Sequence, residues 1–460
     1  MTDVAAILNE AKRVHFVGIG GSGMFPLVEI LHSEGYEITG SDVLEGGIIS
    51  SERAMGIAVN IGHDASLVEG ADAVVVTAAL LAGNPETTRA KELGIPIIER
   101  AELLGYISSL YNRAICISGT HGKTTSTSML VSIFMLAKRD PSAVIGGKLP
   151  LINGYGRKGS GDCIVIEACE FKDTFLHLVP DLSVILNVDA DHLEYFGSLD
   201  GVKASFTKFA NLAKTAVVAN GDDQNTLDSL CGVTRPVILF GENESCDFVI
   251  HDIENYSSAF YSFALRGKRG EIGKFQLRVP GLHNVHNAAA AAVCAHLSGV
   301  CAADIQSGFD SFKGAGRRFE IRGVFGGITI ADDYAHHPAE IKATLDAAAK
   351  MGFKRIFAVF QPFTYTRTLN LLDDFARVLS AADQVVMTEI MGSREVNTLG
   401  VYTSDLAAKI DRSVWFDSFD EISKYCLENA QAGDLIITMG CGDIYKAADM
   451  MVKQCGNSNR

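Results

Sequence analysis

Short apolar runs alternate along the chain with amphipathic stretches, and most of the runs end at glycine or at a polar residue. Four runs in the N-terminal part predict strands: 14–17, 36–42, 73–77 and 96–98. Helical patterns follow the first run as far as Leu31 and occupy residues 85–93. Because strands that alternate with helices are typical of a doubly wound sheet, we expect one such unit here.

The same alternation restarts twice farther along the chain. The second series contains the apolar runs 114–117, 164–170 and 184–192. The third series contains the runs 328–338, 356–368, 384–387 and 434–439. A chain of 460 residues also exceeds what one core usually organises. We therefore expect an α/β protein of three domains, 1–112, 113–315 and 316–460, of which the first and the third are Rossmann-like.

Composition and charge exclude several classes of protein. The hydrophobic fraction of 47% and the charged fraction of 21% are those of a globular protein. A net charge of -15 repels nucleic-acid phosphates, so we expect no nucleic-acid partner. The start lacks a leader pattern and no apolar stretch approaches the ~20 residues that span a bilayer, so we expect a cytoplasmic protein without a membrane partner. The ten cysteines form no C-x-x-C pair and are expected to be reduced. A monomer or weak homodimer is expected.

A glycine-rich motif carries the strongest chemical signal. Residues 119–125 read Gly-Thr-His-Gly-Lys-Thr-Thr, directly after an apolar run and before a helical pattern. Such a loop cradles phosphates with backbone N–H groups, while Lys123 reaches the outer phosphates and Thr124 holds Mg²⁺. The full motif would need glycine at position 117, where the chain has Ile117, so only the short form is present. We therefore expect a P-loop mononucleotide-binding sheet in the central domain, but no ordinary ATPase or GTPase.

Two polar residues follow the neighbouring apolar runs of this domain. Glu167 lies near the end of one run, and His192 at the end of the next. Ligands of parallel α/β sheets gather outside the carboxyl ends of the strands, so both residues are expected near Lys123 and Thr124, where they could hold Mg²⁺. Such a residue, taken alone, is more often an ordinary polar residue at the end of a strand than a metal ligand, and it is the combination with Lys123 and Thr124 that indicates a site.

The N-terminal unit contains a second phosphate-type turn. Residues 18–24 read Gly-Ile-Gly-Gly-Ser-Gly-Met, and Asp42 follows about twenty residues later, as the ribose-binding acid of a dinucleotide site does. An NAD-dependent dehydrogenase is therefore one interpretation. The same turn also binds any other diphosphate at a helix N-terminus.

A third motif precedes an alanine-rich helix. Asn284 and Asn287 are three residues apart and share one face of this helix. Amides placed in this way can read the edge of an adenine base. Equally, they can cap the helix and contact its backbone, and the sequence leaves both alternatives open.

These motifs, together with Asp191-His192, Gly316-Arg317-Arg318-Phe319 and the run from Asp332 to Pro338, resemble in order and spacing the Mur ligases. The resemblance covers essentially the whole chain, and the N-terminal turn is most similar to that of the members that add L-alanine. It implies that the first domain binds UDP-N-acetylmuramate, the second ATP and the third the amino acid.

The resemblance also implies roles for individual residues. The catalytic residues would be Lys123, Glu167, His192 and Arg367. The metal ligands would be Thr124, Glu167 and His192. The nucleotide would contact Gly119, Thr120, His121, Gly122, Lys123, Thr124, Thr125, Asn284, Asn287, Arg318 and Asp333. The other substrates would contact Gly20, Gly21, Ser22, Gly23, Met24, Ser41, Asp42, His63, Tyr334, His336 and Arg367.

The implied activity is ATP-dependent ligation of L-alanine to the carboxylate of UDP-N-acetylmuramate through an acyl phosphate, a step of peptidoglycan synthesis that requires ATP and Mg²⁺. The alternatives are a recycling ligase that adds a tripeptide, a ligase for glycine or serine, the NAD-dependent dehydrogenase, and a non-catalytic nucleotide-binding regulator. Two positions depart from the family pattern: Cys169 stands where many members have aspartate, and Phe363 where many have histidine.

Overall fold

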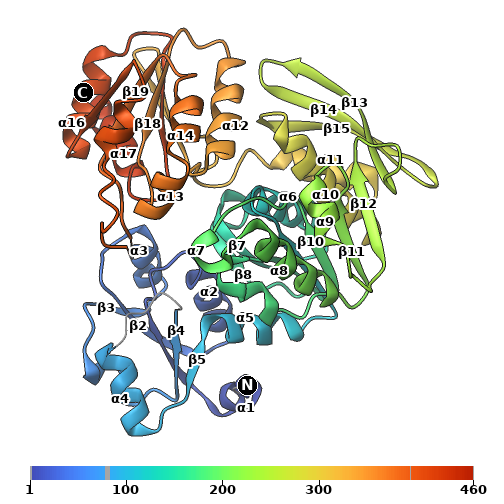
Figure 1. Ribbon diagram of the computed structural model, residues 1–460. Coiled ribbons are helices and arrows are strands. Elements are labelled where there is room, and N and C mark those ends of the chain that lie inside the picture. The colour runs from blue at the N-terminus through green and yellow to red at the C-terminus, as the bar shows by residue number, and fades with distance from the viewer. Residues whose placement is uncertain (1–2, 78–82, 394, 459–460) are drawn as a thin grey trace. The chain divides into compact units, whose positions relative to one another are not determined.

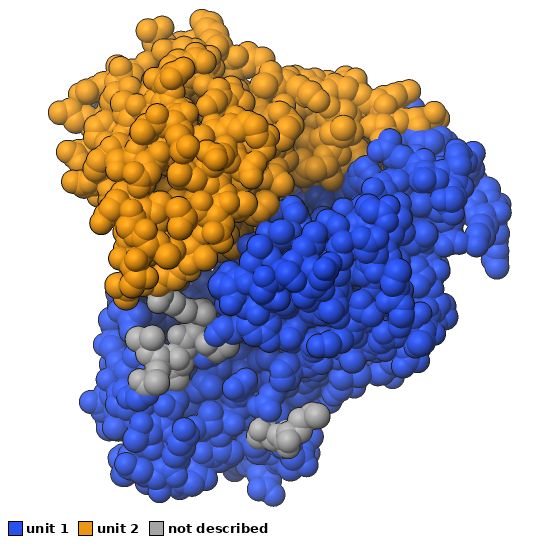
Figure 2. Space-filling model, viewed as in Figure 1, with its two compact units in different colours: residues 1–251, 264–275, 286–312 blue, residues 252–263, 276–285, 313–460 orange. Residues whose placement is uncertain are grey.

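The computed structural model describes residues 3–77, 83–393 and 395–458. These residues form three sheets, which confirms the expected α/β fold of three sheet-bearing domains. By contacts they group into two compact units: 1–251 with 264–275 and 286–312, and 252–263 with 276–285 and 313–460 (Figure 2). The three domain boundaries given above stay a prediction. None of the described helices combines the length and the hydropathy that crossing a membrane requires.

The N-terminal sheet is parallel throughout, in the order β3-β2-β1-β4-β5. Its strands are β1 (Arg13–Val17), β2 (Glu37–Asp42), β3 (Ala58–Ile61), β4 (Ala73–Val76) and β5 (Ile97–Glu99). Its helices are α1 (Val4–Glu10), α2 (Phe25–Ser33), α3 (Gly47–Ala54), η1 (Ala65–Val68), α4 (Pro85–Leu93) and α5 (Arg100–Ser109). The sequence predicted each of these strands except β3, whose residues are mostly exposed and whose short apolar run is interrupted by Asn60.

Helices cover both faces of this sheet (Figure 1). Successive side chains of a strand point to opposite faces. Val75 accordingly packs in the same apolar cluster as Leu27 of α2. Val74 and Val76 pack in a second cluster with Ala90 of α4. The continuous apolar run of β4 is therefore the pattern of a strand buried on both faces.

The central sheet has ten strands, in the order β15-β14-β13-β12-β11-β10-β6-β9-β7-β8. They are β6 (Arg113–Ser118), β7 (Ser142–Leu149), β8 (Gly154–Arg157), β9 (Cys163–Glu167), β10 (Leu182–Ile185), β11 (Ala216–Asn220), β12 (Val237–Gly241), β13 (Phe248–Ser257), β14 (Phe260–Gly267) and β15 (Gly270–Pro280). The accompanying helices are α6 (Lys123–Leu136), η2 (Pro150–Ile152), η3 (Phe171–His177), α7 (Leu193–Phe196), α8 (Leu199–Asn211), α9 (Gln224–Ser229), α10 (His283–Leu297) and α11 (Ala302–Ser311).

The order of strands around β6 positions the central site. Strands β9 and β10 are the two parallel neighbours of β6, so the segments that follow them lie on either side of the loop after β6. Strand β10 ends at Ile185, earlier than the apolar run 184–192 suggested. The rest of that run is not a strand, and it contacts the loop that follows β6.

One apolar cluster joins the first two sheets. It contains Phe16 of β1, Ile107 of α5, Cys116 of β6 and Phe175 of η3, all almost fully buried. Tyr111, beside the predicted boundary, is buried as well, and its hydroxyl donates to Ser142 Oγ at 2.8 Å. Shared burial of this kind explains why these two sheets belong to one compact unit.

The C-terminal sheet has the order β16-β17-β21-β18-β19-β20, with β16 antiparallel to β17 and the other pairs parallel. Its strands are β16 (Glu320–Phe325), β17 (Ile328–Asp333), β18 (Ile356–Phe360), β19 (Gln384–Thr388), β20 (Ser413–Phe416) and β21 (Leu435–Met439). Its helices are α12 (Pro338–Ala349), α13 (Tyr365–Asn370), α14 (Leu372–Leu379), α15 (Thr403–Ala407), α16 (Phe419–Asn429) and α17 (Tyr445–Ser458). Ala358 packs in a cluster with Leu345 of α12. Its neighbour Val359 packs in another with Ile422 of α16, so helices cover both faces here too.

Candidate active site

The loop between β6 and α6 depends on two glycines with positive φ. Gly119 has φ +145° and Gly122 has φ +83°, in the region that favours glycine. A Cβ at Gly119 would lie 2.9 Å from the Cβ of Leu186, and a Cβ at Gly122 would overlap the side-chain amide of Asn287. The backbone of this loop can therefore follow its course only with glycine at both positions.

Asn187, which the sequence did not mark as a site residue, holds this loop. Its backbone oxygen accepts from the N–H of Thr120 at 3.1 Å. Its side-chain Oδ1 accepts from the N–H of His121 at 2.7 Å, and its Nδ2 donates to the carbonyl of His121 at 3.0 Å. In addition, the N–H of Asp189 donates to Thr120 Oγ1 at 2.9 Å. The segment after β10 thus holds the loop in place through backbone and side chain.

Lys123 forms a buried ion pair in this structure. Its Nζ lies 2.9 Å from Glu170 Oε2 and donates to the carbonyl of Gly119 at 2.6 Å. The side chains of Lys123 and Glu170 are only 15% and 4% exposed. Burial lowers the pKa of Lys123, but the charges of Glu170, Cys169 and Glu167 and the hydrogen bond to Glu170 together outweigh this effect and raise the pKa overall. Lys123 is therefore a fixed cation beside the loop. Glu170 was absent from the predicted site, although its place shortly after Glu167 could have marked it.

Thr124 and Glu167 are in direct contact. The hydroxyl of Thr124 donates to Glu167 Oε1 at 3.0 Å, and the N–H of Gly146 donates to Oε2 at 2.7 Å. The structure thus brings Lys123, Thr124 and Glu167 together at the carboxyl end of the central sheet, as expected from the sequence. A hydroxyl and a carboxylate oxygen form a donor set that suits Mg²⁺.

His192 lies farther along the segment after β10. It has a φ of +55°, and its ring lies 4.6 Å from that of Phe171. Within the described ranges its ion pairs are with Asp191 at 3.9 Å and Glu194 at 3.5 Å, and not with Glu167. Shared metal binding by Glu167 and His192 therefore stays a prediction.

The two amides of α10 lie in different surroundings. The Nδ2 of Asn284 donates to the carbonyl of Pro280 at 2.7 Å, which is the backbone contact that the sequence left open. Asn287 lies against Gly122 of the loop. Contact of either amide with adenine stays a prediction.

Strand β2 holds the N-terminal glycine turn. The N–H groups of Gly18 and Ile19 donate to the carbonyl of Ser41 at 2.8 and 3.0 Å. The N–H of Gly20 donates to Asp42 Oδ2 at 3.0 Å. Asp42, predicted as a ligand-binding acid, thus also fixes the turn itself. A Cβ at Gly23 would lie 3.6 Å from the guanidinium of Arg100, so the turn has a neighbouring cation that the sequence analysis missed.

In the C-terminal domain, residues before β16 and after β17 gather around the ring of Tyr334. The guanidiniums of Arg317 and Arg318 lie 5.0 and 5.1 Å from the ring centre of Tyr334, and the ring of His336 lies 5.5 Å from it. Asp333 accepts from the N–H of Phe319 at 2.8 Å. Burial raises the pKa of Asp333 to about 6, although the charge of Arg318 counteracts this effect.

Arg317, which the sequence did not propose as a site residue, connects two strand ends. Its Nε lies 2.9 Å from Asp332 Oδ2, and its Nη2 donates to the carbonyl of Gly440 at 2.6 Å. Arg367 lies on the short helix α13, close enough to Cys441 to influence the pKa of its thiol. Arg317 and the predicted substrate residue Arg367 thus both lie near the residues that follow β21.

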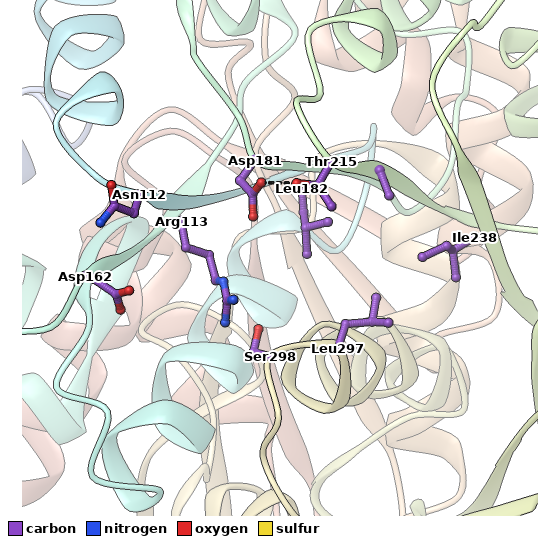
Figure 3. Close-up of a pocket in the computed structure, with 10 residues that line it drawn as sticks. Asn112, Arg113, Asp162, Asp181, Leu182, Thr215, Ile238, Leu297 and Ser298 are labelled. Carbon is purple, nitrogen blue, oxygen red and sulfur yellow. Dashed lines mark hydrogen bonds between the residues drawn. The ribbon is translucent and has the colours of Figure 1, made fainter. Parts of the chain in front are cut away.

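A cavity of about 360 Å³ lies elsewhere in the central domain (Figure 3). It is lined by Asn112, Arg113, Asp162, Asp181, Leu182, Thr215, Ala216, Ile238, Leu297 and Ser298. Arg113 and Leu182 are the first residues of β6 and β10, so the cavity lies at the amino ends of these strands. Ligands of parallel α/β sheets bind at the opposite, carboxyl ends, where the glycine loop lies. None of the predicted site residues lines this cavity.

Three family models match the chain along most of its length. They are the Mur ligase family catalytic domain over residues 13–112, the Mur ligase middle domain over 117–295 and the Mur ligase glutamate ligase domain over 317–442. The chain belongs to the Mur ligase family. This finding confirms the resemblance seen in the sequence and removes support from the dehydrogenase interpretation.

Within the family, the chain is similar along nearly its whole length to ligases that carry the name UDP-N-acetylmuramate–L-alanine ligase. The chain is 43% identical to a UDP-N-acetylmuramate–L-alanine ligase of Caldanaerobacter subterraneus, over 97% of this chain and 98% of the relative. It is also 43% identical to the enzyme of the same name from Acetivibrio thermocellus, over 97% and 96%. The solved UDP-N-acetylmuramate-alanine ligase of Thermotoga maritima superposes with a TM-score of 0.83 at 27% identity, over 97% and 99% of the two chains. A murein peptide ligase of Psychrobacter arcticus, at 24% identity, shares the fold with a TM-score of 0.76.

Proposed function

We propose that this chain is an ATP-dependent ligase that joins L-alanine to the carboxylate of UDP-N-acetylmuramate. The observation that carries the proposal is the near full-length 43% identity to ligases of that name, in a chain whose loop residues Lys123, Thr124 and Glu167 lie together. The products would be UDP-N-acetylmuramoyl-L-alanine, ADP and phosphate, in peptidoglycan synthesis.

The chemistry explains why fixed charges are needed. A carboxylate is a poor electrophile, and its charge repels the γ-phosphate that it attacks. When the carboxylate oxygen attacks phosphorus, ADP leaves and an acyl phosphate forms. The neutral amine of L-alanine then attacks the carbonyl carbon and phosphate leaves, so no side-chain nucleophile is needed. Lys123 neutralises charge on the transferred phosphate because it is held as a cation at the edge of the loop.

Thr124 and Glu167 would hold a Mg²⁺ ion, since their hydroxyl and carboxylate oxygens already meet at the end of β9. His192 is proposed to help hold a second ion. Such ions would supply charge neutralisation at the phosphates. His192 and His336 are the candidate bases for the alanine ammonium, and Tyr334, His336 and Arg367 are proposed to bind the amino acid and the muramoyl carboxylate.

In the N-terminal domain, the turn of Gly18 to Met24 would bind the UDP diphosphate, with Ser41, Asp42 and His63 beside it. The proposed setting is the cytoplasm, where UDP-N-acetylmuramate, ATP and L-alanine would be the small-molecule partners. The chain would act as a monomer or weak homodimer.

Phosphate release from ATP tests the function directly. The purified protein is assayed with Mg²⁺ and UDP-N-acetylmuramate, adding L-alanine, glycine, L-serine or L-Ala-D-Glu-meso-diaminopimelate in turn. We expect release that depends on L-alanine, with weaker release for glycine and serine. Release only with the tripeptide would assign the recycling activity instead. Absence of release with every acceptor would contradict the ligase proposal and favour a regulator.

A further inference from the structure

A buried carboxylate lies in the N-terminal domain beneath the glycine turn. Glu86, in the first turn of α4, has 0% exposure. Its Oε2 accepts from His15 Nε2 at 2.8 Å and from Ser41 Oγ at 2.8 Å, while its Oε1 accepts from His63 Nδ1 at 2.7 Å. Three side chains from three different segments thus direct hydrogens at one carboxylate.

The surroundings hold Glu86 in its ionised form. Burial alone would raise the pKa of Glu86, but the hydrogen bonds from His15, Ser41 and His63 outweigh it and lower the pKa. The position in the first turn of a helix, where the N–H of Glu86 donates to Asn84 Oδ1, also favours a negative charge. An ionised carboxylate only accepts hydrogen bonds, so each of its three partners must donate.

This requirement fixes the state of His63. Its Nδ1 must carry the hydrogen that Glu86 accepts, whether the ring is neutral or protonated. The second ring nitrogen, Nε2, is then the atom left to face a ligand, and the side chain of His63 is 20% exposed while Glu86 is fully covered. Ser41 Oγ, 3.1 Å from His63 Nδ1, adds a second contact on the same side of the ring.

The same cluster is joined to the glycine turn. The backbone carbonyl of Ser41 accepts from the N–H groups of Gly18 and Ile19, and its hydroxyl donates to Glu86. His15 is buried in β1, where its Nδ1 lies 2.8 Å from Thr39 Oγ1 while its Nε2 holds Glu86. A displacement of Glu86 would therefore shift both Ser41, which supports the turn, and His63.

We propose that Glu86 is a positioning residue for the UDP-sugar site: it orients the ring of His63 with Nε2 presented to the diphosphate, and it holds Ser41 under the turn. This inference rests on the proposed function, because it assigns the diphosphate of the UDP-sugar to this turn. Glu86 itself does not touch the substrate.

The first test uses Glu86→Gln with Glu37→Gln as the matched control. Glu37 is an exposed acid of the same domain, paired with Arg13 at the surface. A glutamine has one acceptor atom and one donor group, so at least one of the three donors loses its acceptor. We expect Glu86→Gln to raise KM for UDP-N-acetylmuramate about tenfold, leaving KM for ATP and kcat within about threefold, and Glu37→Gln to change none of them. A general loss of stability would instead change kcat and the KM values of all substrates together, and that result would overturn the proposal.

The second test separates positioning from a merely structural role. The dissociation constant of UDP is measured for Glu86→Gln, for His63→Ala and for the variant that carries both substitutions. Because Glu86 acts through His63 and Ser41, we expect the double variant to weaken UDP binding by less than the product of the two single effects. An effect equal to that product would overturn the proposal.

The ¹⁵N chemical shifts of His63 give a readout without ligand: we expect the Nδ1–H form in the native protein and a mixture of forms in Glu86→Gln. An unchanged His63 signal would also overturn the proposal.

Measurements on the wild-type protein distinguish a failure of the proposed ligase function from a failure of the role proposed for Glu86. If it neither binds UDP nor forms the ligase product, the proposed function fails. If it does both and Glu86→Gln matches it in KM, only the role of Glu86 fails.

Discussion

The buried ion pair between Lys123 and Glu170 should contribute measurably to the thermal midpoint of unfolding. Lys123→Met keeps the length of the side chain but removes its charge, so Glu170, 4% exposed, loses the cation with which it pairs. Breaking a buried pair by removing one partner costs about 3–5 kcal/mol, because a charge stays buried without compensation. For a domain of about 150–250 residues, each kcal/mol lowers the thermal midpoint by about 2–4 °C, so we expect a decrease of about 6–20 °C.

Two measurements test this reasoning. In scanning calorimetry the double variant Lys123→Met/Glu170→Gln should regain most of the lost midpoint, because neither charge is then buried alone. A Lys123→Met midpoint within about 2 °C of the native one, or a double variant no more stable than the single one, would contradict a buried ion pair of this strength. In the phosphate assay both variants should lose about 10²–10³-fold or more in kcat, since the cation proposed to face the transferred phosphate is gone.

Binding of UDP-N-acetylmuramate gives the control for this experiment. The proposed site for the UDP-sugar lies in the N-terminal domain, so its dissociation constant in Lys123→Met should stay within about threefold of the native value at a temperature where the variant is folded. Loss of this affinity together with turnover would show that the domains do not divide the work in the proposed way.

Glu52, Gly122 and Thr124 each allow a separate test. Glu52 is fully buried without a hydrogen-bond partner among the described residues, and burial raises its pKa to about 8 from 4.5. The folded protein therefore binds a proton that the unfolded chain releases, and the free energy of unfolding falls as the pH rises from 4.5 to about 8. Glu52→Gln removes this effect, so it should raise the thermal midpoint at pH 8.5 but hardly at pH 4. Equal shifts of the midpoint at the two pH values would contradict this prediction. Gly122→Ala should weaken ATP binding more than about tenfold in a titration with a fluorescent ATP analogue, because it strains a positive φ and overlaps Asn287; an unchanged affinity would argue against it. Thr124→Ala should raise the Mg²⁺ concentration for half-maximal turnover about tenfold, with recovery in Thr124→Ser, and the absence of any shift would remove Thr124 from the metal site.

Local sequence pattern was enough to find the loops. The order of strand, glycine loop and helix around Lys123, and again around Gly20, follows from apolar runs and glycine spacing, which act over a few residues. The same holds for the strands β4, β6 and β18, whose continuous apolar runs reflect burial on both faces. Strand β3 was missed because its apolar run is short and interrupted by Asn60, and strand β11 was missed although it is buried and apolar.

The fold class, the family and the position of the glycine loop can be predicted from the sequence, since each of them is encoded in contiguous residues or in their spacing. Which distant side chains come together at the proposed sites follows only from the folded domain. Asn187 reaches the loop because β10 is a neighbour of β6, Glu170 meets Lys123 because β9 is the other neighbour, and Glu86 meets His63 across the N-terminal sheet. The physical reason is that strand order in a parallel sheet follows from the packing of the whole domain, and no local pattern records it.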